Sequence, residues 1–215
     1  MSKKRRSFPL PKISMREAAA SEDATFERMD SPVWDVCVYH LHKLPSVASL
    51  WPAKTSTQGN VKGPHKGKQL KTADALYLAP NGKPYFIEFK AQPSRNVNED
   101  DIRGKAFESL YAAALSVLGE CPMEAIRAKA EFIVVFKNTS DETRDYYTQK
   151  SKDDFMKISK YFQNRGHLLD AENVPIYFNL DRFKKAGFYQ DVHTFDKEQF
   201  EQWATRHCLA APSEA

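Results

Sequence analysis

The chain has 215 residues, of which 41% are hydrophobic and 28% charged, and its formal net charge is +4. Its 8 glycines and 12 prolines are too few for a collagen-like or low-complexity chain, while 14 Phe, 9 Tyr and 3 Trp supply enough apolar surface for a folded core. No apolar run approaches the roughly 20 residues that cross a bilayer, so we expect a cytoplasmic protein without membrane contact. The net charge permits nucleic-acid binding without indicating it.

Residues 1–24 are predicted to form a disordered basic tail. The basic residues at positions 3–6 repel one another, and Pro9 and Pro11 interrupt regular structure. Residues 25–210 have the length of one domain. We therefore expect a single folded domain that follows the tail.

The first helix of this domain is predicted over residues 33–44. Ser31 is a suitable N-cap, Pro32 suits the first helical position, and Pro45 ends the pattern. The apolar residues that recur at helical spacing are Val33, Trp34, Cys37, Val38, Leu41 and Leu44. The stretch 56–72 that follows is rich in glycine and lysine and is predicted to be a basic loop.

A β-hairpin is predicted next, with strands over residues 73–79 and 85–90. The first segment alternates in polarity, and the second is rich in aromatic and β-branched residues. The connecting residues, which form a strong turn signal, are Pro80, Asn81, Gly82, Lys83 and Pro84.

A second helix is predicted from the acidic run at residues 99–101, which suits the helix dipole, to Gly119, which ends the helix. Its expected core stripe consists of Phe107, Leu110, Tyr111, Ala114, Leu115 and Leu118. A buried strand over residues 131–136 follows. The later elements are predicted as a helix over 141–163, a strand over 175–180 and a terminal helix over 195–208 packed through Phe200 and Trp203.

Three charged residues lie at one end of the predicted hairpin, which is otherwise apolar. Asp74 lies early in the first strand, and Glu88 and Lys90 end the second. Because Glu88 and Lys90 are two residues apart, both side chains project from the same face of the strand. Burying such charges is costly unless they pair or hold a metal ion, so they indicate a functional site.

The pattern of Thr72-Ala73-Asp74, a hairpin and then Glu88-Phe89-Lys90 resembles the PD-(D/E)xK nuclease-like superfamily. The resemblance covers about residues 33–137, and Ala73 stands where the family motif has proline. It implies an α/β fold with a restriction-endonuclease-like core in the order α-β-β-β-α-β, in which helices flank a central mixed sheet.

The resemblance also implies roles for individual residues. Asp74 and Glu88 would bind Mg²⁺, for which Mn²⁺ would substitute, and Lys90 would position or activate the attacking water. Gln92 extends the motif to Glu-x-Lys-x-Gln and would line the site. The family's first helix often adds an acidic residue near the metal, and the candidates here are Glu27, Asp30 and Asp35. We choose Asp35, in the first turns of the predicted helix, although a carboxylate there also suits the helix dipole.

The register of the hairpin decides whether Asp74 and Glu88 share a face. A two-residue turn at residues 81–82 would pair Asp74 with Phe89 and turn the aspartate away from Glu88. The site therefore requires a loop with an odd number of residues or a bulge near Asp74, and the prolines on both flanks favour an odd loop.

Phosphate contacts are expected from basic residues near the hairpin. These residues are Lys66, Lys68 and Lys71 in the basic loop and Arg103 and Lys105 in the second helix. Each is equally well explained as a solvated surface charge. His40 and His42 lie on different sides of the predicted first helix, so we expect them to be poor metal ligands.

These features lead to the hypothesis of magnesium-dependent phosphodiester hydrolysis in nucleic acid, with DNA the preferred substrate and RNA left open. Carboxylates hold magnesium, which neutralises the charge that develops on the phosphate. The alternatives are a catalytically inactive nuclease-like fold that binds nucleic acid or protein, and an accidental match of the hairpin. The hypothesis also allows for a homodimer or an accessory protein partner.

Overall fold

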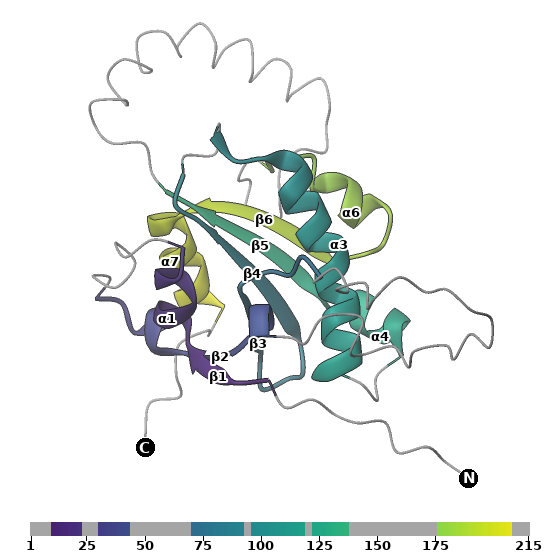
Figure 1. Cartoon of the computed structure of the whole chain (residues 1–215), viewed down its shortest axis with the longest axis horizontal. Helices are drawn as coiled ribbons and strands as arrows, with labels where there is room; N and C mark the ends of the chain where they lie inside the picture. Colours follow the sequence, from purple (N-terminus) through teal and green to yellow (C-terminus); the bar gives the residue numbers. More distant parts are fainter. Residues whose placement is uncertain are drawn as a thin grey trace, which may run out of the picture.

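The structure is a computed structural model, and it describes residues 10–22, 30–43, 70–92, 96–118, 122–137 and 176–207. These residues form an α/β arrangement built on one six-stranded mixed sheet (Figure 1). Among the helices in these ranges, none is long and apolar enough to cross a membrane.

The strands follow one another across the sheet in the order β1-β2-β3-β4-β5-β6. They are β1 (Lys12–Ser14), β2 (Cys37–His40), β3 (Ala75–Leu78), β4 (Pro84–Lys90), β5 (Glu131–Phe136) and β6 (Asp191–Asp196). Neighbours from β1 to β4 are antiparallel, while β4, β5 and β6 are parallel. Because β4 and β5 are buried on both faces, their sequences are almost continuously apolar.

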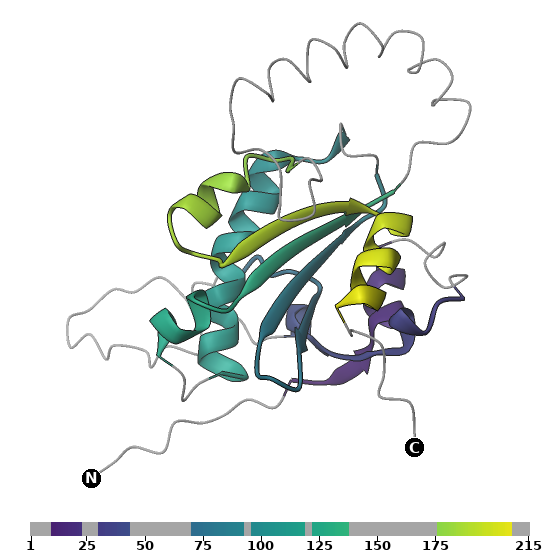
Figure 2. The same ribbon diagram turned by 180° about the vertical axis from the view of Figure 1, so that it is seen from behind.

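Helices cover both faces of this sheet (Figures 1 and 2). They are α1 (Met15–Ala20), the short 3-10 helices η2 (Pro32–Asp35) and η3 (Leu41–Lys43), α3 (Glu99–Ser116), α4 (Met123–Arg127), α6 (Asp181–Lys185) and α7 (Lys197–Arg206). One face carries α3, α4 and α6, and the other carries α1 and α7. Each face of the sheet has its own hydrophobic core. Side chains of β4 alternate between the two cores, since Phe86 packs on the α3 side and Ile87 on the α7 side.

The expected class of fold, an α/β protein with a central mixed sheet flanked by helices, is confirmed. The elements α1, β2, β3, β4, α3 and β5 follow the order α-β-β-β-α-β, with the short α4 inserted before β5. The helix that opens this order is α1, which lies inside the segment expected to be a tail.

The prediction of a disordered tail over residues 1–24 is wrong for residues 12–20, which form β1 and α1. Ser14 caps α1, because its hydroxyl accepts a hydrogen bond of 3.1 Å from the Glu17 N–H while the Glu17 carboxylate accepts one of 2.8 Å from the Ser14 N–H. Met15, Ala18 and Ala19 are buried against the sheet. Residues 1–9 lie outside the described ranges.

The predicted helix over residues 33–44 is also wrong. Ser31 does cap a helix, but η2 lasts one turn and the chain then extends into β2. Val36 and Val38 are buried on either side of the exposed Cys37, which is the alternation of a strand. Because β2 pairs with both β1 and β3, sheet hydrogen bonding overrides the helical spacing.

The predicted hairpin is confirmed, and its loop has an odd number of residues. The Ala79 N–H donates a hydrogen bond of 3.0 Å to the Lys83 carbonyl, which leaves residues 80–82 as the loop. Gly82 has φ of 77°, the left-handed conformation that ends a three-residue loop of this kind.

This loop sets the register that the candidate site requires. Ala75 pairs with Ile87, so the preceding Asp74 comes level with Glu88. The two acidic residues therefore lie beside each other on neighbouring strands and on the same side of the sheet as α3.

Helix α3 begins where predicted, and Leu110 of the predicted stripe is buried, but the face that packs on the sheet is rotated away from the two aromatic residues of that stripe. Asn98 caps it by accepting hydrogen bonds from the N–H groups of Asp100 and Asp101. Phe107 and Tyr111, expected in the core, are 41% and 48% exposed. The buried face consists of Ile102, Lys105, Ala106, Ser109, Leu110, Ala112 and Ala113. The small residues on this face let α3 lie close to the sheet.

The predicted strand over residues 175–180 is wrong where the structure describes it. Residues 178–180 form a turn, in which Phe178 and Asn179 have φ of 61° and 52°. These left-handed values are incompatible with a strand. The predicted helix over 141–163 lies outside the described residues.

The strand over residues 131–136 and the terminal helix are confirmed as β5 and α7, and Phe200 and Trp203 are buried as expected. Strand β6 was not predicted. Its buried positions include polar residues such as His193 and Thr194, which hide the alternation typical of a strand.

Candidate metal centre

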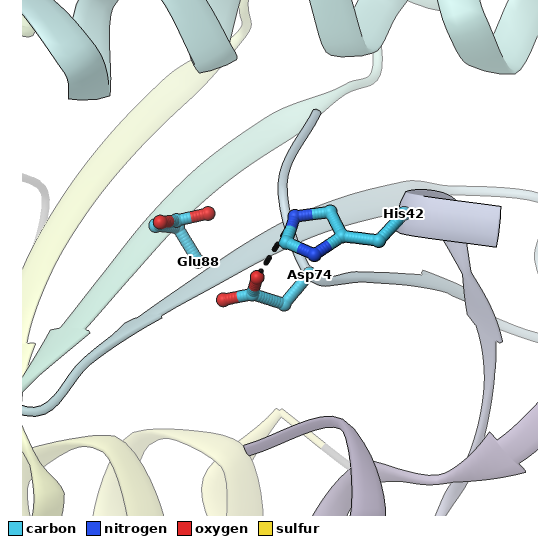
Figure 3. Close-up of side chains that lie close together, drawn as sticks. All are labelled: His42, Asp74 and Glu88. Atoms are coloured by element: carbon cyan, nitrogen blue, oxygen red, sulfur yellow. Dashed lines mark ion pairs between the residues drawn. The ribbon is translucent and has the colours of Figure 1, made fainter. Parts of the chain in front are cut away.

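Side chains from four elements meet beside the β3-β4 hairpin. Asp74 directly precedes β3, Glu88 belongs to β4, His42 to η3 and Lys105 to α3. Figure 3 shows the imidazole of His42 beside the carboxylate of Asp74, with Glu88 close by. One potential ligand atom from each of His42, Asp74 and Glu88 lies within 4.8 Å of the other two. These atoms are close enough to bind a single cation.

Asp74 is fully buried, and its two oxygens have different surroundings. Oδ2 accepts a hydrogen bond of 2.6 Å from the Phe89 N–H. Oδ1 lies 3.0 Å from His42 Nε2, but this nitrogen is a hydrogen-bond partner of the Thr72 carbonyl, 2.8 Å away. The contact between the ring and Oδ1 is an ion pair when His42 is protonated. The Asp74 carboxylate raises the pKa of His42, against the opposite effect of burial.

Glu88 is also fully buried, and among the described residues its partners contact one oxygen, Oε1. Oε1 lies 2.7 Å from Lys90 Nζ and 2.7 Å from Lys105 Nζ. Burial and the neighbouring Asp74 raise the pKa of Glu88 to about 8, although the two lysines act in the opposite direction.

Two buried oxygens of this centre accept no hydrogen bond from any residue that the structure describes. They are Asp74 Oδ1 and Glu88 Oε2. An unpartnered buried carboxylate oxygen is costly, and a divalent cation between the two carboxylates would supply the missing partner. The residues present therefore fit a metal ion. Carboxylates suit Mg²⁺ and Mn²⁺, and the imidazole of His42 favours a transition metal such as Mn²⁺.

A third carboxylate, Asp101 in the first turn of α3, lies at the rim of the centre. Its two oxygens are 3.1 Å from Lys71 Nζ and 3.4 Å from Lys90 Nζ. Burial alone would raise the pKa of Asp101, but the lysines lower it. For Lys90, burial alone would lower the pKa, but Glu88 and Asp101 raise it, so Lys90 is an ammonium ion at neutral pH.

Ser109 joins α3 to the segment that leads into Asp74. Its hydroxyl accepts a hydrogen bond of 2.8 Å from the Ala73 N–H and donates one of 2.6 Å to the Lys105 carbonyl. Since Ser109 and Ala73 are fully buried, this bridge fixes the position of α3 relative to the Asp74 carboxylate.

The structure brings three of the predicted catalytic residues together and leaves one outside. Asp74, Glu88 and Lys90 form the centre described above. Gln92 is exposed, and its backbone carbonyl accepts a hydrogen bond of 3.2 Å from Lys137. The choice of Asp35 as an acidic ligand is wrong, because Asp35 is exposed in η2 and lies 3.0 Å from the guanidinium of Arg16.

The residues expected to contact phosphate are in different situations. Lys71 is half exposed at the rim of the centre, whereas Arg103 forms ion pairs with Glu99 and Asp100 on its own helix. Lys105, expected to contact phosphate or else to be a solvated charge, is instead buried against Glu88. The other two, Lys66 and Lys68, lie outside the described residues.

His42 is the residue that sequence reasoning dismissed and the structure brings into the centre. On a continuous helix, His40 and His42 would face different sides. In the structure β2 ends at His40, and the Leu41 N–H donates a hydrogen bond of 3.3 Å to the Asp74 carbonyl. The next residue, His42, therefore lies beside Asp74. His42 could have been identified from the sequence if residues 37–40 had been recognised as a strand that pairs with β3.

No family model, curated protein or solved structure matches this chain. The described residues form an α/β fold, a mixed sheet with helices on both faces. The functional proposal rests on the geometry of the described residues.

Proposed function

We propose that the chain is a metal-dependent nuclease of the PD-(D/E)xK type that hydrolyses phosphodiester bonds, with DNA as the first substrate to test. The observation that carries the proposal is the convergence of buried Asp74 and Glu88, with Lys90 at their edge, at one end of the β3-β4 hairpin. The element order around this hairpin supports a restriction-endonuclease-like core.

Asp74, Glu88 and His42 would hold the metal, with Mg²⁺ and Mn²⁺ as the candidates. A divalent ion bound there would neutralise charge on the phosphate and lower the pKa of a coordinated water. The atoms that would bind the ion are Asp74 Oδ1 and Glu88 Oε2, which accept no hydrogen bond from any described residue. The hydrogen bond from Phe89 to Asp74 holds that carboxylate in place.

Lys90 would act through its positive charge. Glu88 and Asp101 keep it protonated, so it is suited to attract the phosphate or donate a proton rather than to accept one. Its side chain is 16% exposed, so the ammonium is accessible from the solvent side of the centre. This position suits contact with a substrate that reaches the metal from outside.

The charges around the centre favour a polyanion once a metal is bound. Lys71, Lys90 and Lys105 balance Asp74, Glu88 and Asp101, so the cluster without metal is neutral when all six groups are ionised. A divalent cation would give it a net positive charge. This change is a physical reason for nucleic acid as the substrate.

The test is cleavage of labelled single-stranded and double-stranded DNA and RNA with Mg²⁺, with Mn²⁺ and with EDTA. We expect cleavage only with metal, and a loss of at least about a hundredfold in Glu88→Gln, since catalytic metal ligands contribute several kcal/mol. The matched control is Glu124→Gln, which changes an exposed glutamate of α4. Full cleavage by a folded Glu88→Gln variant would refute the proposal. Metal-independent binding without cleavage would assign the alternative, a non-hydrolytic binding module.

A further inference from the structure

We propose that the ammonium group of Lys105 supplies positive charge at this centre when no metal is bound, and that a divalent ion binds by displacing it. The inference rests on the proposed metal centre and concerns how that centre is regulated. Lys105 Nζ lies 2.7 Å from Glu88 Oε1 and 3.9 Å from Asp74 Oδ1. It therefore contacts the same two carboxylates that would hold the metal.

The surroundings of Lys105 distinguish it from Lys90. Lys90 has a further carboxylate, Asp101, at the rim of the centre. Within the described part of the chain, the ion pairs of Lys105 are with Glu88 and Asp74 alone. Lys105 is 8% exposed, so these two carboxylates are what compensates its buried charge. When a metal ion binds both carboxylates, they no longer compensate the positive charge of Lys105.

Electrostatic repulsion opposes binding of the metal while Lys105 remains in place. When both are ionised, Asp74 and Glu88 together carry two negative charges, which Lys90 and Lys105 neutralise. A divalent ion added to this arrangement would leave two uncompensated positive charges in a buried site, a few ångströms from an ammonium. Moving Lys105 away reduces this excess, so metal binding and displacement of Lys105 are coupled.

The displacement requires movement of the side chain alone. The backbone of Lys105 is fixed by the hydrogen bond from Ser109 to its carbonyl, and Ser109 is in turn bonded to the Ala73 N–H. The flexible four-carbon stem of lysine allows the ammonium to rotate without a shift of α3. Lys105 then lowers the affinity for metal without being a metal ligand.

The test is a titration with Mn²⁺, followed by electron paramagnetic resonance of the free ion, in the absence of nucleic acid. Replacing Lys105 by methionine keeps the length and removes the charge, so Lys105→Met should bind Mn²⁺ at least about tenfold more tightly than the unmodified protein. Lys105→Arg keeps the charge and should show no such gain. The control Lys129→Met changes an exposed lysine that follows α4, and its affinity should stay within about threefold.

Equal or weaker binding by Lys105→Met would overturn this proposal and leave the metal centre in place. Absence of Mn²⁺ binding in every variant would overturn both. If Lys105→Met does not fold, acetylation of the unmodified protein provides a second measurement. The modification of Lys105, measured by peptide mass spectrometry, should rise several-fold with saturating Mg²⁺ relative to the exposed Lys129. An unchanged ratio would overturn the proposal.

Discussion

The raised pKa of Glu88 predicts that the metal-free protein loses stability as the pH rises. In the folded protein this pKa is about 8, compared with an ordinary value of 4.5. Between these values the folded protein retains a proton that the unfolded chain has lost, so the contribution of Glu88 to stability is highest below about pH 4.5 and falls as the pH rises towards 8. His42 acts in the same direction, because its raised pKa stabilises the folded state at low pH and this contribution is lost as the pH rises through the folded pKa.

The size of the effect follows from the two pKa values of Glu88. Each pH unit over which one proton separates the two states is worth about 1.4 kcal/mol. Integrated between pH 5.5 and pH 8.5, the free energy of unfolding should fall by about 3 kcal/mol through Glu88 alone. Glu88→Gln imitates the protonated acid and has no proton to lose, so this variant should lack most of that slope.

The assay is urea denaturation in EDTA across this pH range, followed by fluorescence of the buried Trp34 and Trp203. Glu124→Gln is the control and should keep the slope of the unmodified protein. Saturating Mn²⁺ at pH 8 should restore stability, by about 2.7 kcal/mol when the free ion is at a hundred times its Kd. The reasoning is refuted if Glu88→Gln and the unmodified protein lose stability equally with rising pH.

Two further substitutions test the centre and the loop that aligns it. His42→Gln should weaken Mn²⁺ binding at least about tenfold, because a ligand is lost. The control is His40→Gln, which changes a ring whose centroid is 6.0 Å from that of His42 and should leave the affinity unchanged. Equal effects of the two substitutions in calorimetry would exclude His42 as a ligand. Gly82→Ala should lower the free energy of unfolding by about 1–2 kcal/mol, because φ is 77°, and Gly82→Asn should lower it less. Equal losses in urea denaturation would mean that the left-handed conformation is not what matters at this position.

The exposed aromatic pair on α3 shows how a correctly predicted helix can have a partly wrong core stripe, since Leu110 of that stripe is buried as expected. Phe107 and Tyr111 have the spacing of a core stripe, and their ring centroids are 5.2 Å apart. The structure instead buries the alanines and Ser109 of the same helix. Periodicity defines the stripes that a helix offers, but the fit against the sheet decides which stripe is used.

Local sequence was sufficient for the elements whose signals are short and strong. The turn signal predicted the hairpin, the apolar run predicted β5, and the acidic start predicted α3, because each depends on neighbouring residues. The alternation of strand side chains also placed Glu88 and Lys90 on one face. These local rules led to two buried carboxylates and a lysine as the candidate site.

The tertiary structure decided which other residues join that site. The pairing of β2 with β3 converted a predicted helix into a strand and brought His42 to Asp74. The rotation of α3 placed Lys105 beside the two carboxylates, where a phosphate contact or a solvated lysine was expected. Both results depend on contacts between segments far apart in the chain. Which helix face is buried and which strands pair depends on how all segments of the chain fit together. A pattern within one short segment does not contain this information.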